Sequence, residues 1–207
     1  YLIANLLLQL PLILCLSLCA IGIPGYVIVN LNLSAFLPTL LLHAAFLSSF
    51  EAIAQCFALI TNPLVGLLCF LTVWFVSFLF NGLLIQPSDV IWPFRVCFYM
   101  LPYRWAITSQ LYQEFVGGPT FSGTLSCATS IVNGTGAAHI QPLCAVRPFY
   151  CPTDPTGLTC YGSEGKQVLD SLKVVYHSIS DVNTYSRDLA IILGIALIFK
   201  LAFALLP

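Results

Sequence analysis

The distribution of charge constrains this chain more than any other feature. Between Tyr1 and Ser88 the sole formally charged residue is Glu51, and every Lys and Arg lies at Arg95 or later. Only 7% of all residues are charged and 59% are hydrophobic, whereas a soluble domain carries roughly 25% charged residues. A chain with so little polar surface is typical of a bilayer, so we predict an all-α membrane protein.

Long apolar runs predict four transmembrane helices, at about 2–29, 35–60, 64–85 and 189–207. Each of the first three exceeds the ~20 residues that cross ~30 Å of hydrocarbon. Turn-forming residues separate them at 30–34 and 61–63. Lys200 falls inside the last run, and we expect its long side chain to reach the membrane interface.

The segment 117–188 differs in character, because it is rich in Gly, Pro, Ser and Thr. Its four cysteines predict two disulfides in an oxidising compartment, with three pairings open. The sequon at Asn133 points to the same extracellular location. No CxxC spacing occurs here, which argues against zinc. The disulfide candidates are Cys127, Cys144, Cys151 and Cys160.

The short loops between the first three spans carry no Lys or Arg, so the positive-inside rule does not orient the chain. The predicted extracellular location of segment 117–188 orients it instead. With the large loop outside, four spans place both chain ends in the cytoplasm. We therefore expect a multi-pass integral protein of the plasma membrane. The net charge of −1 says nothing about nucleic acid, and no basic cluster suggests a nucleic-acid partner, so we expect none.

Between the third span and the loop, residues 89–116 predict a helix pair. Pro93 and Pro102 interrupt an otherwise helical spacing of apolar and polar residues. Amphipathic rings suit the headgroup level, so the pair is expected to be re-entrant or interfacial. An ordinary helical hairpin in the loop is the alternative. The rings belong to Trp92, Tyr99, Tyr103, Trp105 and Tyr112.

Glu51 is the residue most indicative of function in the apolar part, because a carboxylate within a span is costly. Gln55 lies one turn later, and His43 and Ser48 precede it on roughly the same face. Such an intramembrane polar strip could bind a polar group of a cargo or form hydrogen bonds between spans. A protonated Glu51 that joins helices is the simpler interpretation.

The order of these segments resembles the C-terminal part of the membrane domain of G-subfamily ABC transporters. The resemblance covers nearly the whole chain. It rests on "FNGLLI" at 80–85, on "YMLPYRWAITSQLYQEF" at 99–115, on "CYGSE" at 160–164 and on "FKLAF" at 199–203. That group includes the multidrug and sterol half-transporters and the pleiotropic drug resistance type.

The resemblance implies an exporter-type domain of six helices, of which this chain holds the last four. The first two helices and the nucleotide-binding domain, with its ATP and Mg, would be absent from the chain. No GxxxxGK[ST] phosphate loop occurs in the sequence. We therefore expect no catalytic residue, cofactor or metal in this chain, and ATP hydrolysis in the parent protein.

The resemblance also implies roles for individual residues. Leu83 and Leu84 match the leucine plug that separates an inner cavity from the outer exit. Leu71 and Phe75 would line the substrate cavity, on a helix face shared with Leu83. The implied partners are membrane lipid, a nucleotide-binding domain, an apolar small-molecule or lipid cargo, and a second membrane domain. This second domain would come from a homodimer, a heterodimer or the other half of a full-size chain.

Two other classes of function remain open from sequence. One is a polytopic channel or receptor whose extracellular loop binds a ligand. The other is a structural or assembly protein of the membrane. A channel usually needs a recurring polar stripe along its pore, and only the second span offers one.

Overall fold

The computed structural model describes residues 2–85, 87–88, 90–116, 129–132, 139–142, 164–180 and 182–205. Three helical stretches are long and apolar enough to cross a membrane: Leu7–Ile28, Leu33–Ala58 and Tyr185–Leu205. The chain is therefore a helical membrane protein. In order, its elements are α1 (Leu2–Ile21), η1 (Gly22–Ile28), η2 (Leu33–Ala35), α2 (Phe36–Ala58), α3 (Pro63–Leu79), α4 (Phe94–Met100), α5 (Pro102–Phe115), β1 (Thr129–Val132), β2 (His139–Pro142), α6 (Gly165–Val175) and α7 (Tyr185–Leu205).

The first span changes its helix type near its end. α1 continues into η1, a stretch of π-helix that contains Pro24. The N–H of Val29 donates to the carbonyl of Pro24, five residues back, at 3.0 Å. Proline cannot donate a backbone hydrogen bond, and a wider turn is one way in which a membrane helix accommodates it.

The turn between the first two spans is tied to α5. The Asn32 side chain caps the short η2 helix by accepting from the N–H of Ser34 at 3.1 Å. The N–H of Asn32 itself donates to the Glu114 carboxylate at 2.7 Å. This bond joins residues 82 positions apart, so it fixes the end of α5 beside the start of α2.

The third predicted span is shorter than the sequence suggested. α3 starts at Pro63, behind an Asn62 cap, and ends at Leu79, so the prediction of a helix to residue 85 is wrong. Its 17 residues span about 26 Å at 1.5 Å per residue. Asn81 and Gly82 end it, and Gly82 has a φ of +87°, a left-handed conformation that side-chain-bearing residues avoid.

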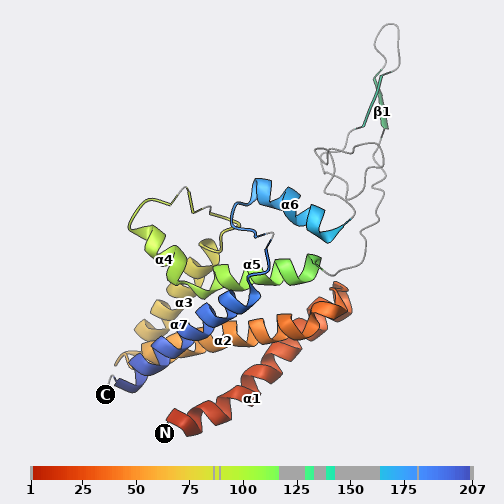
Figure 1. Ribbon diagram of the computed structural model, residues 1–207. Coiled ribbons are helices and arrows are strands. Elements are labelled where there is room, and N and C mark those ends of the chain that lie inside the picture. The colour runs from red at the N-terminus through yellow and green to blue at the C-terminus, as the bar shows by residue number, and fades with distance from the viewer. Residues whose placement is uncertain are drawn as a thin grey trace.

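The centre of the molecule is the packing of α2 against α7, with α5 crossing both (Figure 1). A buried cluster joins the three helices at Leu42, Ala45, Ala106 and Ile192. The Ser49 hydroxyl of α2 donates to the Ile192 carbonyl of α7 at 3.0 Å. Small residues such as Ala and Ser let membrane helices approach closely.

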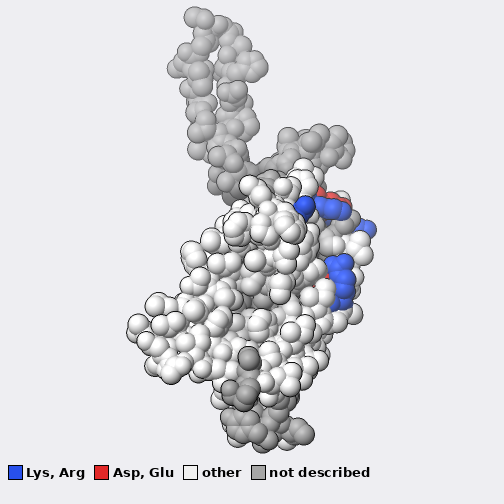
Figure 2. All heavy atoms as spheres, turned by 90° about the vertical axis from the view of Figure 1, so that its left-hand side faces the viewer, with Lys and Arg blue, Asp and Glu red and all other residues white. Residues whose placement is uncertain are grey.

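The two ends of the molecule differ in polarity. Both chain ends lie at the lower left in Figure 1, away from α5, α6 and the antiparallel pair of β1 and β2. This hairpin was not predicted from sequence. Apart from Glu51 and Lys200, the charged residues of the described part lie between α4 and the start of α7. In Figure 2 the charged atoms that are visible lie along the right-hand edge of the face shown, in its upper half.

The short helix α6 packs onto α5. Val168 and Leu169 are buried on one of its faces. A Cβ on Gly165 would lie only 1.7 Å from the Phe115 carbonyl oxygen. Only glycine permits this contact, which brings the two helix ends together.

Candidate functional site

The two residues predicted to line a cavity lie on one exposed face of α3. Leu71 and Phe75 are four positions apart, which is about one helical turn, and are 48% and 55% exposed. Within the described part of the chain, no element covers this face. The exposed surface continues toward the start of α3 at Leu64, Leu67 and Leu68.

The two residues predicted to form a plug lie in a turn after α3. The buried Asn81 side chain accepts hydrogen bonds from the N–H groups of Leu83 at 2.8 Å and Leu84 at 3.0 Å. Leu84 is 58% exposed, whereas Leu83 is half-buried. The prediction that Leu83 shares a helix face with Leu71 and Phe75 is therefore wrong, because the helix has already ended at Leu79.

This turn packs closely against the segment that leads into α7. A Cβ on Gly82 would lie 2.7 Å from the Ser178 hydroxyl oxygen and 3.5 Å from the Phe98 ring. The turn is thus held between α4 and the linker from α6 to α7. Its conformation depends on these contacts as well as on the Asn81 bonds.

A cluster of four polar side chains joins the three spanning helices. The Lys200 ammonium of α7 donates to Glu51 of α2 at 2.5 Å, to Gln9 of α1 at 2.6 Å and to Gln55 of α2 at 3.1 Å. The Gln55 amide also donates to Glu51. An ammonium has three donors, so Lys200 is fully hydrogen-bonded. We call these four residues the polar cluster.

Lys200 was expected to reach the membrane interface; its side chain lies inside the bundle beside Glu51. Its residue exposure is 8%, because Glu51 lies within ion-pair distance inside the bundle. Glu51 and Gln55 do come together, as predicted from sequence. Sequence reasoning missed Gln9, although an amide within an apolar run was a usable signal. His43 lies elsewhere, in a groove beside α5.

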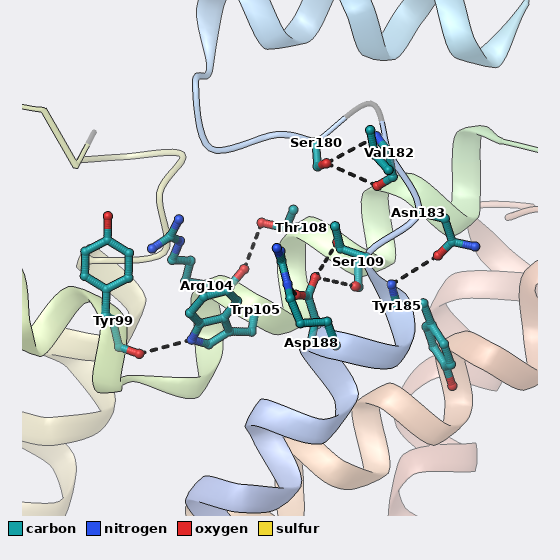
Figure 3. A network of polar contacts seen from close by, with 12 residues as sticks. Tyr99, Arg104, Trp105, Thr108, Ser109, Ser180, Val182, Asn183, Tyr185 and Asp188 are labelled. Carbon is teal, nitrogen blue, oxygen red and sulfur yellow. Dashed lines mark hydrogen bonds and ion pairs between the residues drawn. The ribbon is translucent and has the colours of Figure 1, made fainter.

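A second polar network anchors the start of α7 to α5 (Figure 3). The fully buried Asp188 carboxylate accepts from the Ser109 hydroxyl and the Thr184 hydroxyl, both at 2.7 Å. The Arg187 guanidinium adds a bond at 3.1 Å. A carboxylate in the first turn of a helix is also favoured by the helix dipole, so this residue is suited to fixing α7 in place.

Arg104 lies among aromatic rings at the junction of α4 and α5. Its guanidinium carbon is 4.5 Å from the Phe98 ring centre, 4.4 Å from Tyr99 and 4.8 Å from Trp105. Burial lowers the pKa of Arg104 from its usual range. The cation–π contacts stabilise the charge, and the Asp188 carboxylate adds a favourable electrostatic interaction. Tyr99 and Trp105, predicted as headgroup-level rings, thus pack around an arginine.

Several predicted residues lie outside the part of the chain that the structure describes. They are Cys127, Cys144, Cys151 and Cys160, together with Asn133 of the sequon. The disulfides and the glycosylation therefore stay predictions. Among the described residues, no group of three or more His, Cys, Asp or Glu side chains is placed to hold a metal ion.

Comparison with known proteins identifies no relative, because no family model, curated protein or solved structure matches this chain.

Proposed function

We propose that this chain is part of the membrane domain of an ATP-driven exporter of the G-subfamily ABC type. Its cargo is an apolar or amphipathic small molecule or lipid. ATP is hydrolysed in a nucleotide-binding domain that this sequence does not contain. The resemblance in the order of sequence segments is the origin of the proposal, and the arrangement of α3 is the structural observation that supports it.

The face of α3 is both apolar and exposed. It presents Leu71 and Phe75 and then runs into the Asn81 turn, which presents Leu84. Facing a second membrane domain, such a surface would line a cavity of aliphatic and aromatic groups. Walls of this kind suit flat, apolar cargo. The turn at the end of α3 would then occupy the exit.

In this proposal Leu83 and Leu84 form the constriction between cavity and exit. Bulky apolar side chains from both domains can close a dry gap without any charge. The Asn81 bonds hold the two leucines in a defined turn. Movement of α3 against its counterpart would then open or close the gap as the nucleotide-binding domains engage and separate.

The polar cluster has a supporting role here. It connects α1, α2 and α7 through the three bonds that Lys200 donates. No residue of α3 takes part in it. The three connected helices would thus behave as one body, against which α3 is free to adjust. A rigid body paired with a mobile gate is a common arrangement in alternating access.

The experiment is transport and ATPase activity of the full-length protein, wild type against Leu83→Ala/Leu84→Ala. Removing both side chains opens the constriction, so we expect an altered efflux rate or altered cargo-stimulated ATPase at normal surface expression. The matched control is Leu197→Ala/Leu201→Ala, which shortens two exposed leucines of α7 and should leave both activities unchanged.

Two results would contradict the proposal at different levels. Unchanged transport in the Leu83→Ala/Leu84→Ala variant would mean that the turn only packs and is no plug. Absence of ATP hydrolysis from the full-length protein would exclude the exporter itself. A channel or receptor function would then be tested by ion flux and ligand binding.

A further inference from the structure

The linker from α6 to α7 lies against the Asn81 turn, which comprises residues 81–84. We call residues 176–180 of this linker the strap. Gly82 has a φ of +87°, and a Cβ at its position would lie 2.7 Å from the Ser178 hydroxyl oxygen and 2.8 Å from the Ser178 Cβ. Ser178 therefore blocks any movement of the turn toward the strap.

The opposite side of the turn packs on a fully buried ring. The Phe98 ring lies 3.5 Å from the same Cβ position of Gly82 and is 0% exposed. The Arg104 guanidinium carbon lies 4.5 Å from the centre of this ring and holds it from the α5 side. The turn is thus enclosed between α4 and the strap, and the strap is the side on which it can be released.

The strap is continuous with α6. The Tyr176 N–H donates to the Leu172 carbonyl of α6 at 2.7 Å, and the Ile179 N–H donates to the Tyr176 carbonyl at 3.0 Å. Ile179 is buried. Because these two turns follow each other directly, a displacement of α6 is passed on to Ser178, which lies within the second turn.

The polar contacts of Ser178 hold the strap only weakly. The Thr108 hydroxyl of α5 donates to the Ser178 carbonyl at 3.3 Å, a long distance for such a bond, and shares its proton with the Arg104 carbonyl at 3.0 Å. The Ser178 hydroxyl is buried and has no hydrogen-bond partner among the described residues. An unbonded buried hydroxyl is unfavourable, and this cost is recovered when the strap lifts and water reaches the group.

We propose that the strap regulates the Asn81 turn. With α6 packed on α5, as in Figure 1, Ser178 holds the turn closed. When α6 moves away from α5, the strap lifts, and the turn is released together with Leu83 and Leu84. The polar end of the bundle in this way controls the segment that follows α3. The consequence for transport rests on the proposed function, whereas the effect on the turn itself does not.

The test is hydrogen–deuterium exchange of the full-length protein in micelles, read by mass spectrometry. The N–H groups of Leu83 and Leu84 are bonded to Asn81, so peptide 80–85 should exchange slowly in the wild type. Release of the strap should make this peptide exchange about three- to ten-fold faster, as expected when one hydrogen bond is lost.

Gly165→Ala tests whether α6 controls the turn. A Cβ at this position would lie 1.7 Å from the Phe115 carbonyl oxygen, so the substitution displaces the start of α6 from α5. Its nearest neighbours all belong to Phe115 and not to the Asn81 turn. We nevertheless expect faster exchange of peptide 80–85. Gly194→Ala is the control, because its Cβ meets nothing within 4 Å, and it should leave this exchange unchanged.

Ser178→Gly and Ser180→Gly form a matched pair within the linker. Each adds the conformational freedom of a glycine, but only the first removes the contact with Gly82. The Ser180 hydroxyl instead bonds to the backbone of Val182 (Figure 3). We expect faster exchange of peptide 80–85 in Ser178→Gly alone, with peptide 165–175 protected in both variants.

Exchange and efflux, measured on the same variants, separate the strap from the proposed function. Faster exchange with altered efflux supports both. Faster exchange with unchanged efflux supports the strap and contradicts a plug at Leu83 and Leu84. Unchanged exchange in Ser178→Gly, or equal acceleration in Ser180→Gly, overturns the strap whatever the efflux rate. Unchanged exchange in Gly165→Ala overturns control by α6. Thermal unfolding checks that each variant is folded, and Ser178→Gly decides the matter if Gly165→Ala is not.

Discussion

At the scale of single residues, the polar cluster shows how a charge is retained inside an apolar bundle. An unpaired ion within a membrane is costly. Here the Lys200 ammonium uses its three donors on Gln9, Glu51 and Gln55. The charge is therefore both paired and hydrogen-bonded, which is the condition under which a buried ion pair is tolerated.

Breaking this pair from one side should destabilise the protein strongly. In Lys200→Met the partly buried Glu51 carboxylate loses its cation, and in Glu51→Gln the buried Lys200 ammonium loses its carboxylate. We expect each variant to lose about 3–5 kcal/mol of stability. The double variant should lose less than the sum of the two, because it leaves no unpaired charge. Equilibrium unfolding in mixed micelles measures all four forms.

The control for the double-mutant cycle of Lys200 and Glu51 is Lys166→Met, which removes an exposed lysine of α6. Its stability should stay within about 0.5 kcal/mol of wild type. Strictly additive costs in the double variant would show that Lys200 and Glu51 do not interact in the protein.

At the scale of elements, α3 is attached mainly by a close approach to the end of α2. A Cβ on Gly66 would lie 2.6 Å from the Phe57 carbonyl oxygen, so only a glycine allows this packing. The rest of α3 offers broad exposed surface. The helix proposed to line the cavity thus packs on α2 and α5 with one side and leaves its other side exposed.

Gly66→Ala and Gly194→Ala should therefore have opposite effects. The first places a methyl group against the Phe57 carbonyl, and we expect a loss of about 1–3 kcal/mol from the displaced backbone. The second meets nothing within 4 Å, and replacing a helical glycine should stabilise the protein by about 0.5–1 kcal/mol. Unfolding of both variants in the same micelles provides the comparison. Equal effects would contradict the close packing of α2 and α3.

Helix boundaries followed local turn signals more closely than apolar content. Pro63 and the Asn62 cap start α3 where the sequence predicted a turn. The predicted helix to residue 85 was too long, because it followed the apolar run through Asn81 and Gly82. Asn-Gly is itself a strong turn signal, and the side chain of Asn81 bonds the two following N–H groups.

At the scale of the whole molecule, polarity is segregated along the bundle. The chain ends lie together at one end, and α5, α6 and the hairpin lie toward the other (Figure 1). Outside the polar cluster, described charges occur only from α4 to the start of α7. The end of the bundle that carries the hairpin is therefore the polar one, and the cysteines and sequon of segment 117–188 predict that it faces the extracellular space.

Glycosylation tests this orientation. The sequon at Asn133 directly follows β1, and we expect it to be modified if the hairpin is extracellular. An endoglycosidase should increase the gel mobility of the wild type and leave Asn133→Gln unchanged. Asn32→Gln serves as the comparison, because Asn32-Leu33-Ser34 is a second sequon. It lies in the turn between two spans and is expected to stay unmodified. An enzyme-resistant wild type with a protease-sensitive loop on the cytoplasmic side would reverse the orientation.

The sequence by itself determined the membrane class, the positions of the first turns, the interruption at Pro102 and the importance of Glu51. These features depend on hydropathy and local turn chemistry, which act over a few residues. Only the tertiary structure decided which partners Lys200 has, since Glu51 and Gln9 are 149 and 191 positions away. The same holds for Asp188 and Ser109, which are 79 positions apart. Such contacts depend on which helices pack together, and in a chain so uniformly apolar the local pattern does not specify that choice.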